Sequence, residues 1–98
     1  MFVTGLGIVS PLGLDARTTW EALSKGTSGV DLISSFDATG FEARIAAEVK
    51  GFDPTNHLEK KEARRLDRFS QLVVAACQEA IKHAALNLDL VDRTRVAI

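Results

Sequence analysis

Residues 3–13 read VTGLGIVSPLG, an apolar stretch in which Gly5 and Gly7 stand one residue apart and a turn sequence follows. The apolar residues at 2–4 and 8–9 predict a buried first strand, and Pro11 with Gly13 predicts the turn that ends it. A helical pattern comes next, and a strand followed by a helix is typical of the α/β class.

Two closely spaced glycines after a strand also raise the question of a nucleotide phosphate site. A dinucleotide fingerprint needs a third glycine and a helix that opens inside the motif. Here Ser10 takes the third position, and the helix starts only near Asp15, whose carboxylate would repel a phosphate. We therefore expect Gly5 and Gly7 to allow close backbone packing.

The middle of the chain predicts one helix and one strand. Asp15 is placed to cap a helix with an apolar face that covers the first strand, and Gly26 is suited to end it. Residues 28–40 predict an irregular, partly buried connection. Alternating apolar and polar residues over 42–50 predict a half-buried strand, at an edge or in a hairpin.

A long helix is predicted over about residues 62–84, because apolar side chains recur there at helical spacing. Residues 95–98 resemble the opening of another buried strand that stops before it gains partners. We therefore expect a single unit, residues 1–98, that is an incomplete part of a larger fold.

Composition excludes several classes of protein. Twelve Lys and Arg stand against 13 Asp and Glu, so the net charge of −1 gives no overall attraction to nucleic acid or anionic lipid. No apolar run reaches the length of a membrane span, and no secretory signal opens the chain. The single cysteine excludes an internal disulfide and indicates a reducing location, either the cytoplasm, which we expect, or the interior of an organelle.

The residue types that carry catalysis are poorly placed here. Cys77 lies within the apolar stripe of the long helix, where a thiol acts as a small hydrophobe without a general base. His57 and His83 are interpreted as surface or helix-end residues. We expect no catalytic residue and no metal site in this chain.

The strongest local feature is the stretch LEKKEARRLDRF, residues 58–69. In one continuous helix, four cations would share an outward face, namely Lys61, Arg64, Arg65 and Arg68. One interpretation is a solvated face partly neutralised by Glu62 and Asp67. The other is a docking patch for an acidic partner, since arginine pairs well with carboxylate and phosphate.

Six blocks resemble, in order and over nearly the whole chain, the N-terminal part of the 3-oxoacyl-[acyl-carrier-protein] synthases. They are VTGLGIVSPLG, TTWEAL, KGTSGV, FDATGF, AAEVKGFDP and KKEARRLDRFSQ. The resemblance implies a thiolase-like α/β/α layered fold, of which this chain is one part. It also implies that Ala85 occupies a position where relatives commonly have glycine.

The resemblance further implies a fatty acid elongating enzyme that condenses an acyl thioester with malonyl-acyl carrier protein, without a cofactor and as a homodimer. Its cysteine nucleophile and two histidines would lie beyond residues 1–98, so this segment alone would be inactive. Lys61, Arg64 and Arg65 would dock the acidic acyl carrier protein, with Arg68 extending the face. A polyketide-type ketosynthase and a non-catalytic module that binds an acidic partner remain the alternatives.

Overall fold

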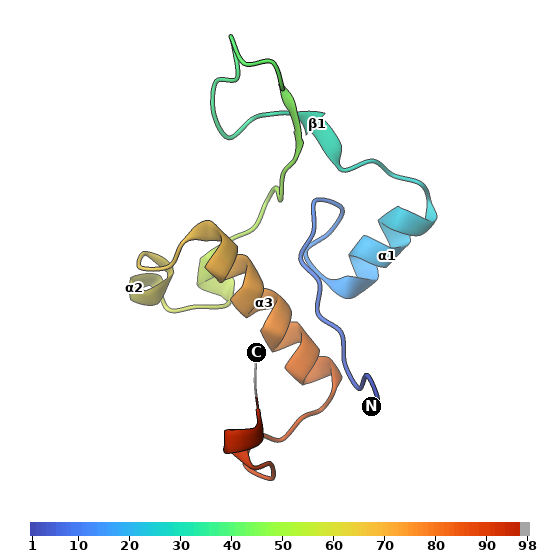
Figure 1. Cartoon of the computed structure of the whole chain (residues 1–98), viewed down its shortest axis with the longest axis vertical. Coiled ribbons are helices and arrows are strands. Elements are labelled where there is room, and N and C mark those ends of the chain that lie inside the picture. The colour runs from blue at the N-terminus through green and yellow to red at the C-terminus, as the bar shows by residue number, and fades with distance from the viewer. Residues whose placement is uncertain (97–98) are drawn as a thin grey trace.

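The computed structural model describes residues 1–96, which form three α-helices, two 3₁₀ turns and one pair of strands (Figure 1). In chain order these are α1 Ala16–Ser24, β1 Val30–Leu32, β2 Ile45–Ala47, η1 Pro54–Asn56, α2 Lys60–Ala63, α3 Arg68–His83 and η2 Arg93–Arg95.

Helix α3 organises the N-terminal segment, which runs beside it (Figure 1). A Cβ added at Gly7 would collide with the carbonyl oxygen of Ala76, and one at Gly5 would come 2.6 Å from the amide nitrogen of Ala84. The two glycines therefore allow close backbone packing, as predicted, and the partner of that packing is a helix.

The predicted first strand is wrong, because residues 1–9 contain no strand. Their backbone is held by side chains of α3 instead: the Leu6 amide donates to His83 Nδ1 at 3.0 Å, and the Ile8 amide donates to Glu79 at 2.8 Å. The predicted turn is confirmed, since Ser10 and Gly13 exchange backbone hydrogen bonds across Pro11.

Helix α1 begins and ends where the sequence predicts. Asp15 Oδ1 accepts a hydrogen bond from the Thr18 amide at 2.7 Å, and Gly26 adopts a φ of 70° just beyond the end of the helix. The expected cover over a strand is absent among residues 1–96, where Trp20 of the apolar face is 68% exposed.

The strands form a two-stranded antiparallel sheet in which Val30 pairs with Ala47 and Leu32 pairs with Ile45. The hairpin predicted around residues 42–50 is confirmed, but β1 falls in a segment predicted to be irregular. The prediction that one face of this strand is half-buried is wrong, because Ile45 is 62% exposed. Figure 1 shows the hairpin projecting away from α3, so no helix in the described part of the chain covers it.

The long helix predicted over residues 62–84 is broken near its start. Helix α2 ends at Ala63 and α3 begins at Arg68, with Asp67 extended at ψ 157°. The chain turns because the Arg65 amide donates to Glu62, three residues back, which tightens the end of α2. The four cations therefore do not share one helix face.

The end of α3 is a Schellman motif with Ala85 in the left-handed position at φ 49°. The Leu86 amide donates to Ile81 at 3.1 Å, and the Ala85 amide donates to Lys82 at 3.1 Å. The residue is thus in the conformation that favours the glycine implied by the family resemblance.

Few apolar side chains are buried within residues 1–96. The buried ones are Phe52, Ala63 and Ala75. The radius of gyration is 16.3 Å, against about 13 Å for a compact domain of this length. Helices and a small sheet are present, as an α/β chain requires, but the layered α/β/α arrangement is not formed by these residues. Of the strand predicted at 95–98, Arg95 lies in η2 and the last two residues lie outside the described range.

Candidate functional site

The basic residues lie at the corner between α2 and α3. Lys61 belongs to α2, and Arg64 and Arg65 lie in the turn that follows it. All three are exposed, and within residues 1–96 no ion pair or side-chain hydrogen bond involves them. We call these three residues the basic corner. Its unneutralised cations can bind a carboxylate or phosphate group of a partner.

Arg68 is separated from the basic corner by its contacts. Its guanidinium carbon lies 4.9 Å from the centre of the Phe52 ring, within cation–π range. The same side chain donates to the carbonyl oxygens of Phe52, at 3.2 Å, and Val49, at 3.4 Å. Arg68 therefore fastens residues 49–52 to the start of α3.

Two glutamines on α3 donate to the backbone that precedes it, Gln71 at the basic corner and Gln78 at His57, just after η1. Gln71 Nε2 donates to the carbonyl oxygens of Ala63, at 2.7 Å, and Leu66, at 3.2 Å. Gln78 Nε2 donates to the carbonyl oxygen of His57 at 2.9 Å. Neither glutamine was predicted from the sequence, although their spacing of seven residues places them on one helix face.

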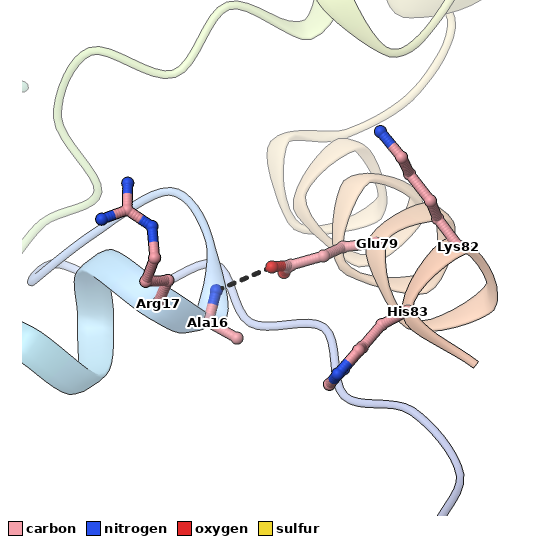
Figure 2. A pocket seen from close by; sticks show the side chains of 5 residues that line it. All are labelled: Ala16, Arg17, Glu79, Lys82 and His83. Atoms are coloured by element: carbon pink, nitrogen blue, oxygen red, sulfur yellow. Dashed lines mark hydrogen bonds between the residues drawn. The ribbon is translucent and has the colours of Figure 1, made fainter. Parts of the chain in front are cut away.

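Glu79, on α3, ties the N-terminal segment to α1 (Figure 2). One carboxylate oxygen accepts from the amide of Ala16, the first residue of α1, and the other from the amide of Ile8, each at 2.8 Å. A carboxylate at a helix N-terminus also interacts favourably with the helix dipole. The pocket beside this contact is lined by Ala16, Arg17, Glu79, Lys82 and His83.

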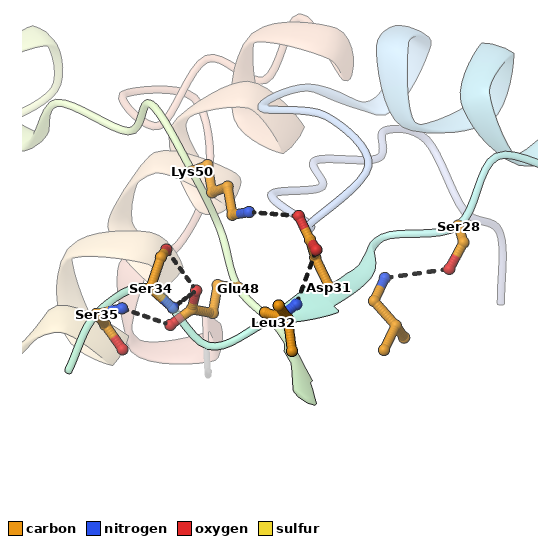
Figure 3. A network of polar contacts seen from close by, with 8 residues as sticks. Ser28, Asp31, Leu32, Ser34, Ser35, Glu48 and Lys50 are labelled. Atoms are coloured by element: carbon orange, nitrogen blue, oxygen red, sulfur yellow. Dashed lines mark hydrogen bonds and ion pairs between the residues drawn. The ribbon is translucent and has the colours of Figure 1, made fainter. Parts of the chain in front are cut away.

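A polar network closes the hairpin (Figure 3). Glu48 accepts hydrogen bonds from the amides of Ser34 and Ser35 and from the Ser34 hydroxyl, at 2.8 to 3.1 Å. Hydrogen bonds from Ser35 and Ser34 lower the pKa of Glu48 to about 2. Lys50 and Asp31 form an ion pair of 3.1 Å across the strands.

The family model described as the beta-ketoacyl synthase N-terminal domain matches residues 1–98. The chain belongs to this family. 3-Oxoacyl-[acyl-carrier-protein] synthase 2 of Staphylococcus aureus is 41% identical over 96 residues, which cover 98% of the chain and 24% of that protein. The synthase 2 of Vibrio harveyi is also 41% identical, over 98% of the chain and 23% of that protein.

A solved structure extends the beta-ketoacyl synthase likeness to three dimensions. The ishigamide ketosynthase/chain length factor matches 89% of the chain and 22% of its own chain, with a TM-score of 0.75 and 32% identity. The beta-ketoacyl synthase segment thus spans about a quarter of the length of its curated relatives.

The nucleophilic and imidazole groups of this beta-ketoacyl synthase segment are not brought together. Cys77 is free and half-buried, so it is less enclosed than predicted. His57 stacks on Phe52 at 5.6 Å between ring centres, and His83 contacts the backbone of Leu6. Within the described part of the chain, no hydrogen bond joins either histidine to Cys77.

Neither a metal-binding cluster nor a membrane-spanning helix occurs within residues 1–96 of the beta-ketoacyl synthase segment. No group of three His, Cys, Asp or Glu side chains there could hold a metal ion. None of the helices in this range combines the length and apolar character needed to cross a bilayer.

Proposed function

We propose that the chain is the N-terminal segment of a fatty acid elongating 3-oxoacyl-[acyl-carrier-protein] synthase. In that reaction an acyl group moves from carrier protein to a cysteine thiol, malonyl-carrier protein loses carbon dioxide, and the resulting carbanion displaces the cysteine to form a carbon–carbon bond. The family match over residues 1–98 and the 41% identity to two synthases support this proposal.

Within such an enzyme this segment supplies scaffold and not chemistry. Among residues 1–96, the half-buried Cys77 has no hydrogen-bonded base, which a cysteine nucleophile needs. The exposed apolar face of α1 suits a segment that is buried against the rest of a thiolase-like α/β/α layered fold. A homodimeric full-length enzyme is part of the same proposal.

The basic corner docks the acidic acyl carrier protein in this proposal. The observation that carries it is the exposure of Lys61, Arg64 and Arg65 without an anionic partner in residues 1–96. Exposed complementary charges act mainly on encounter and specificity, so their effect is expected to fall with added salt. Arg68 is assigned a structural role because Phe52 and Val49 engage its side chain.

The test uses a full-length enzyme in which residues 1–98 replace the matching segment of the Staphylococcus aureus synthase; we call it the joined synthase. Condensation of an acyl thioester with malonyl-carrier protein by the joined synthase is the expected result. A folded joined synthase without this activity would contradict the proposed function.

The docking role is tested in the same enzyme by reversing all three charges of the basic corner to Glu. We expect the KM for acyl carrier protein to rise at least about tenfold at low salt, with kcat little changed. Reversing Arg17, Lys25 and Lys82 instead makes the same change in net charge, and these three residues are also exposed. An equal rise in KM for this control would show that overall charge, and not the corner, governs affinity.

A polyketide-type ketosynthase is the second candidate. The likeness to the ishigamide ketosynthase/chain length factor, at 32% identity, favours it. In the proposed full-length enzyme the pocket for the growing chain would lie beyond residues 1–98, so sequencing of the gene past the codon for Ile98 is the experiment that distinguishes the two. Retention of the cysteine and both histidines there would also exclude an inactive binding module.

A further inference from the structure

The side-chain amide of Gln71 lies at the basic corner and contacts the backbone on both sides of its two arginines. One NH₂ group contacts the carbonyl oxygens of Ala63 at 2.7 Å and Leu66 at 3.2 Å. These are the residues immediately before Arg64 and immediately after Arg65. Because an amide nitrogen has two hydrogens, one can go to each carbonyl, and the backbone is fixed on both sides of the arginine pair.

The corner needs such support because its own secondary structure is slight. Helix α2 has four residues, too few to be stable alone, and its last carbonyl groups have no partner within the helix. Ala63 anchors the end of α2 at 6% exposure. Gln71 satisfies the carbonyl of this buried residue, so losing the donor leaves a polar group unpaired as well as freeing the turn.

We propose that Gln71 is a positioning residue for carrier-protein docking, holding Arg64 and Arg65 in the arrangement that the acidic partner meets. This inference rests on the proposed function of the basic corner. Long exposed side chains lose conformational freedom on binding, and a backbone fixed beforehand lowers that cost. Gln71 itself adds no charge, so its contribution is separable from the electrostatic one.

Gln71→Met in the joined synthase removes both donors at similar side-chain length. We expect the KM for acyl carrier protein to rise about fivefold with kcat within about twofold. The slope of log KM against log salt should stay unchanged, because all three cations remain. Arg65→Ala should raise KM and reduce that slope. Gln78→Met removes an equivalent donor on the same helix face, away from the corner, and should leave KM unchanged.

A second variant keeps the test decisive if Gln71→Met does not fold. Gln71→Lys replaces the amide with an ammonium that can donate to both carbonyl oxygens, and Gln78→Lys adds the same charge elsewhere on the face. We expect the KM for acyl carrier protein of Gln71→Lys to be no higher than that of Gln78→Lys, because the donor is kept and the added charge lies at the basic corner. A clearly higher KM for Gln71→Lys would overturn the proposal.

The outcomes distinguish failure of the docking proposal from failure of the proposed role of Gln71. If charge reversal of the basic corner leaves KM unchanged, the docking proposal itself fails. If charge reversal raises KM while Gln71→Met and Gln78→Met behave alike, only the role of Gln71 fails. A reduced salt slope for Gln71→Met would also overturn it, because the variant would then act by displacing charge and not by loosening the turn.

Discussion

Gly7 lies so close to Ala76 of α3 that no Cβ fits between them, and an added Cβ would also come 2.7 Å from the Ala80 amide nitrogen. Both obstacles are helix backbone, which cannot rotate aside. Gly7→Ala is therefore expected to destabilise the joined synthase by about 2 kcal/mol or more, measured by denaturant unfolding. In Gly29→Ala the obstacle is the Pro11 side chain at 2.9 Å. If Gly7→Ala lowers the free energy of unfolding by no more than Gly29→Ala does, the packing of Gly7 against α3 is contradicted.

Within residues 1–96, α1 and α3 each end in a Schellman motif, with the Thr27 amide donating to Ala22 and the Leu86 amide to Ile81. The two motifs predict opposite effects for opposite substitutions. Ala85 adopts φ 49° and Gly26 adopts φ 70°, each just beyond the end of its helix. Ala85→Gly is expected to stabilise the end of α3 by about 0.5–1 kcal/mol, because glycine enters this region without the Cβ clash.

Gly26→Ala should destabilise the end of α1 by a similar amount, although a Cβ at Gly26 meets no atom within 4 Å. Hydrogen exchange of the amides in the last turn of each helix measures both effects. Slower exchange in Gly26→Ala, or faster exchange in Ala85→Gly, would contradict the role of the left-handed conformation.

We expect attachment of the N-terminal segment to α3 to depend more on Glu79 than on any other side chain. In Glu79→Gln an NH₂ group replaces one of the two oxygens that accept from Ile8 and Ala16. One of these amides then loses its partner, which should cost about 1–2 kcal/mol in the free energy of unfolding.

Glu21→Gln makes the same chemical change in an exposed pair with Arg17 on α1. Such pairs contribute little, so a loss of less than about 0.5 kcal/mol is expected. Denaturant unfolding of both variants provides the comparison. Equal losses would show that the Glu79 bridge is no stronger than a surface ion pair.

Features that depend on adjacent residues could be predicted from the sequence. The Asp15 cap and the Gly26 end of α1 are local, and both appear where expected. The break between α2 and α3 is not visible in the pattern, because Leu66 and Phe69 keep helical spacing across it. Periodicity reports where apolar residues fall, and a turn of suitable length preserves it.

The residue types of the candidate site could be predicted from the sequence, but the tertiary contacts around it could not. The basic corner follows from Lys61, Arg64 and Arg65 alone. The diversion of Arg68 to Phe52, 16 residues away, and the reach of Glu79 to Ile8, 71 residues away, depend on tertiary contacts that no local spacing encodes. The exposure of Ile45 was also unpredictable, since a pattern indicates an apolar face without indicating what covers it.

The Glu48 network predicts an acid-sensitive hairpin. Hydrogen bonds from Ser35 and Ser34 lower the pKa of Glu48 from 4.5 to about 2 in the folded chain. A carboxyl with a depressed folded pKa stabilises the fold above its unfolded pKa, and this contribution is lost as pH falls toward the folded value. Protection of the hairpin amides should therefore decline between about pH 4.5 and 2, as measured by hydrogen exchange.

Ser34→Ala removes the hydroxyl donor at 2.8 Å and leaves the backbone donors in place. The pKa of Glu48, followed by NMR titration of its carboxyl carbon, should then move upward toward 4.5, because fewer hydrogen bonds favour the charged form. Glu48→Gln should reduce the pH dependence of hairpin protection in this window and leave the part that comes from Asp31, whose pKa is lowered by the Leu32 amide and by Lys50. Ser28→Ala is a control, since its hydroxyl accepts from Val30 and does not contact Glu48. A Glu48 pKa that stays near 4.5 in the unmodified chain would contradict the network as the source of acid sensitivity.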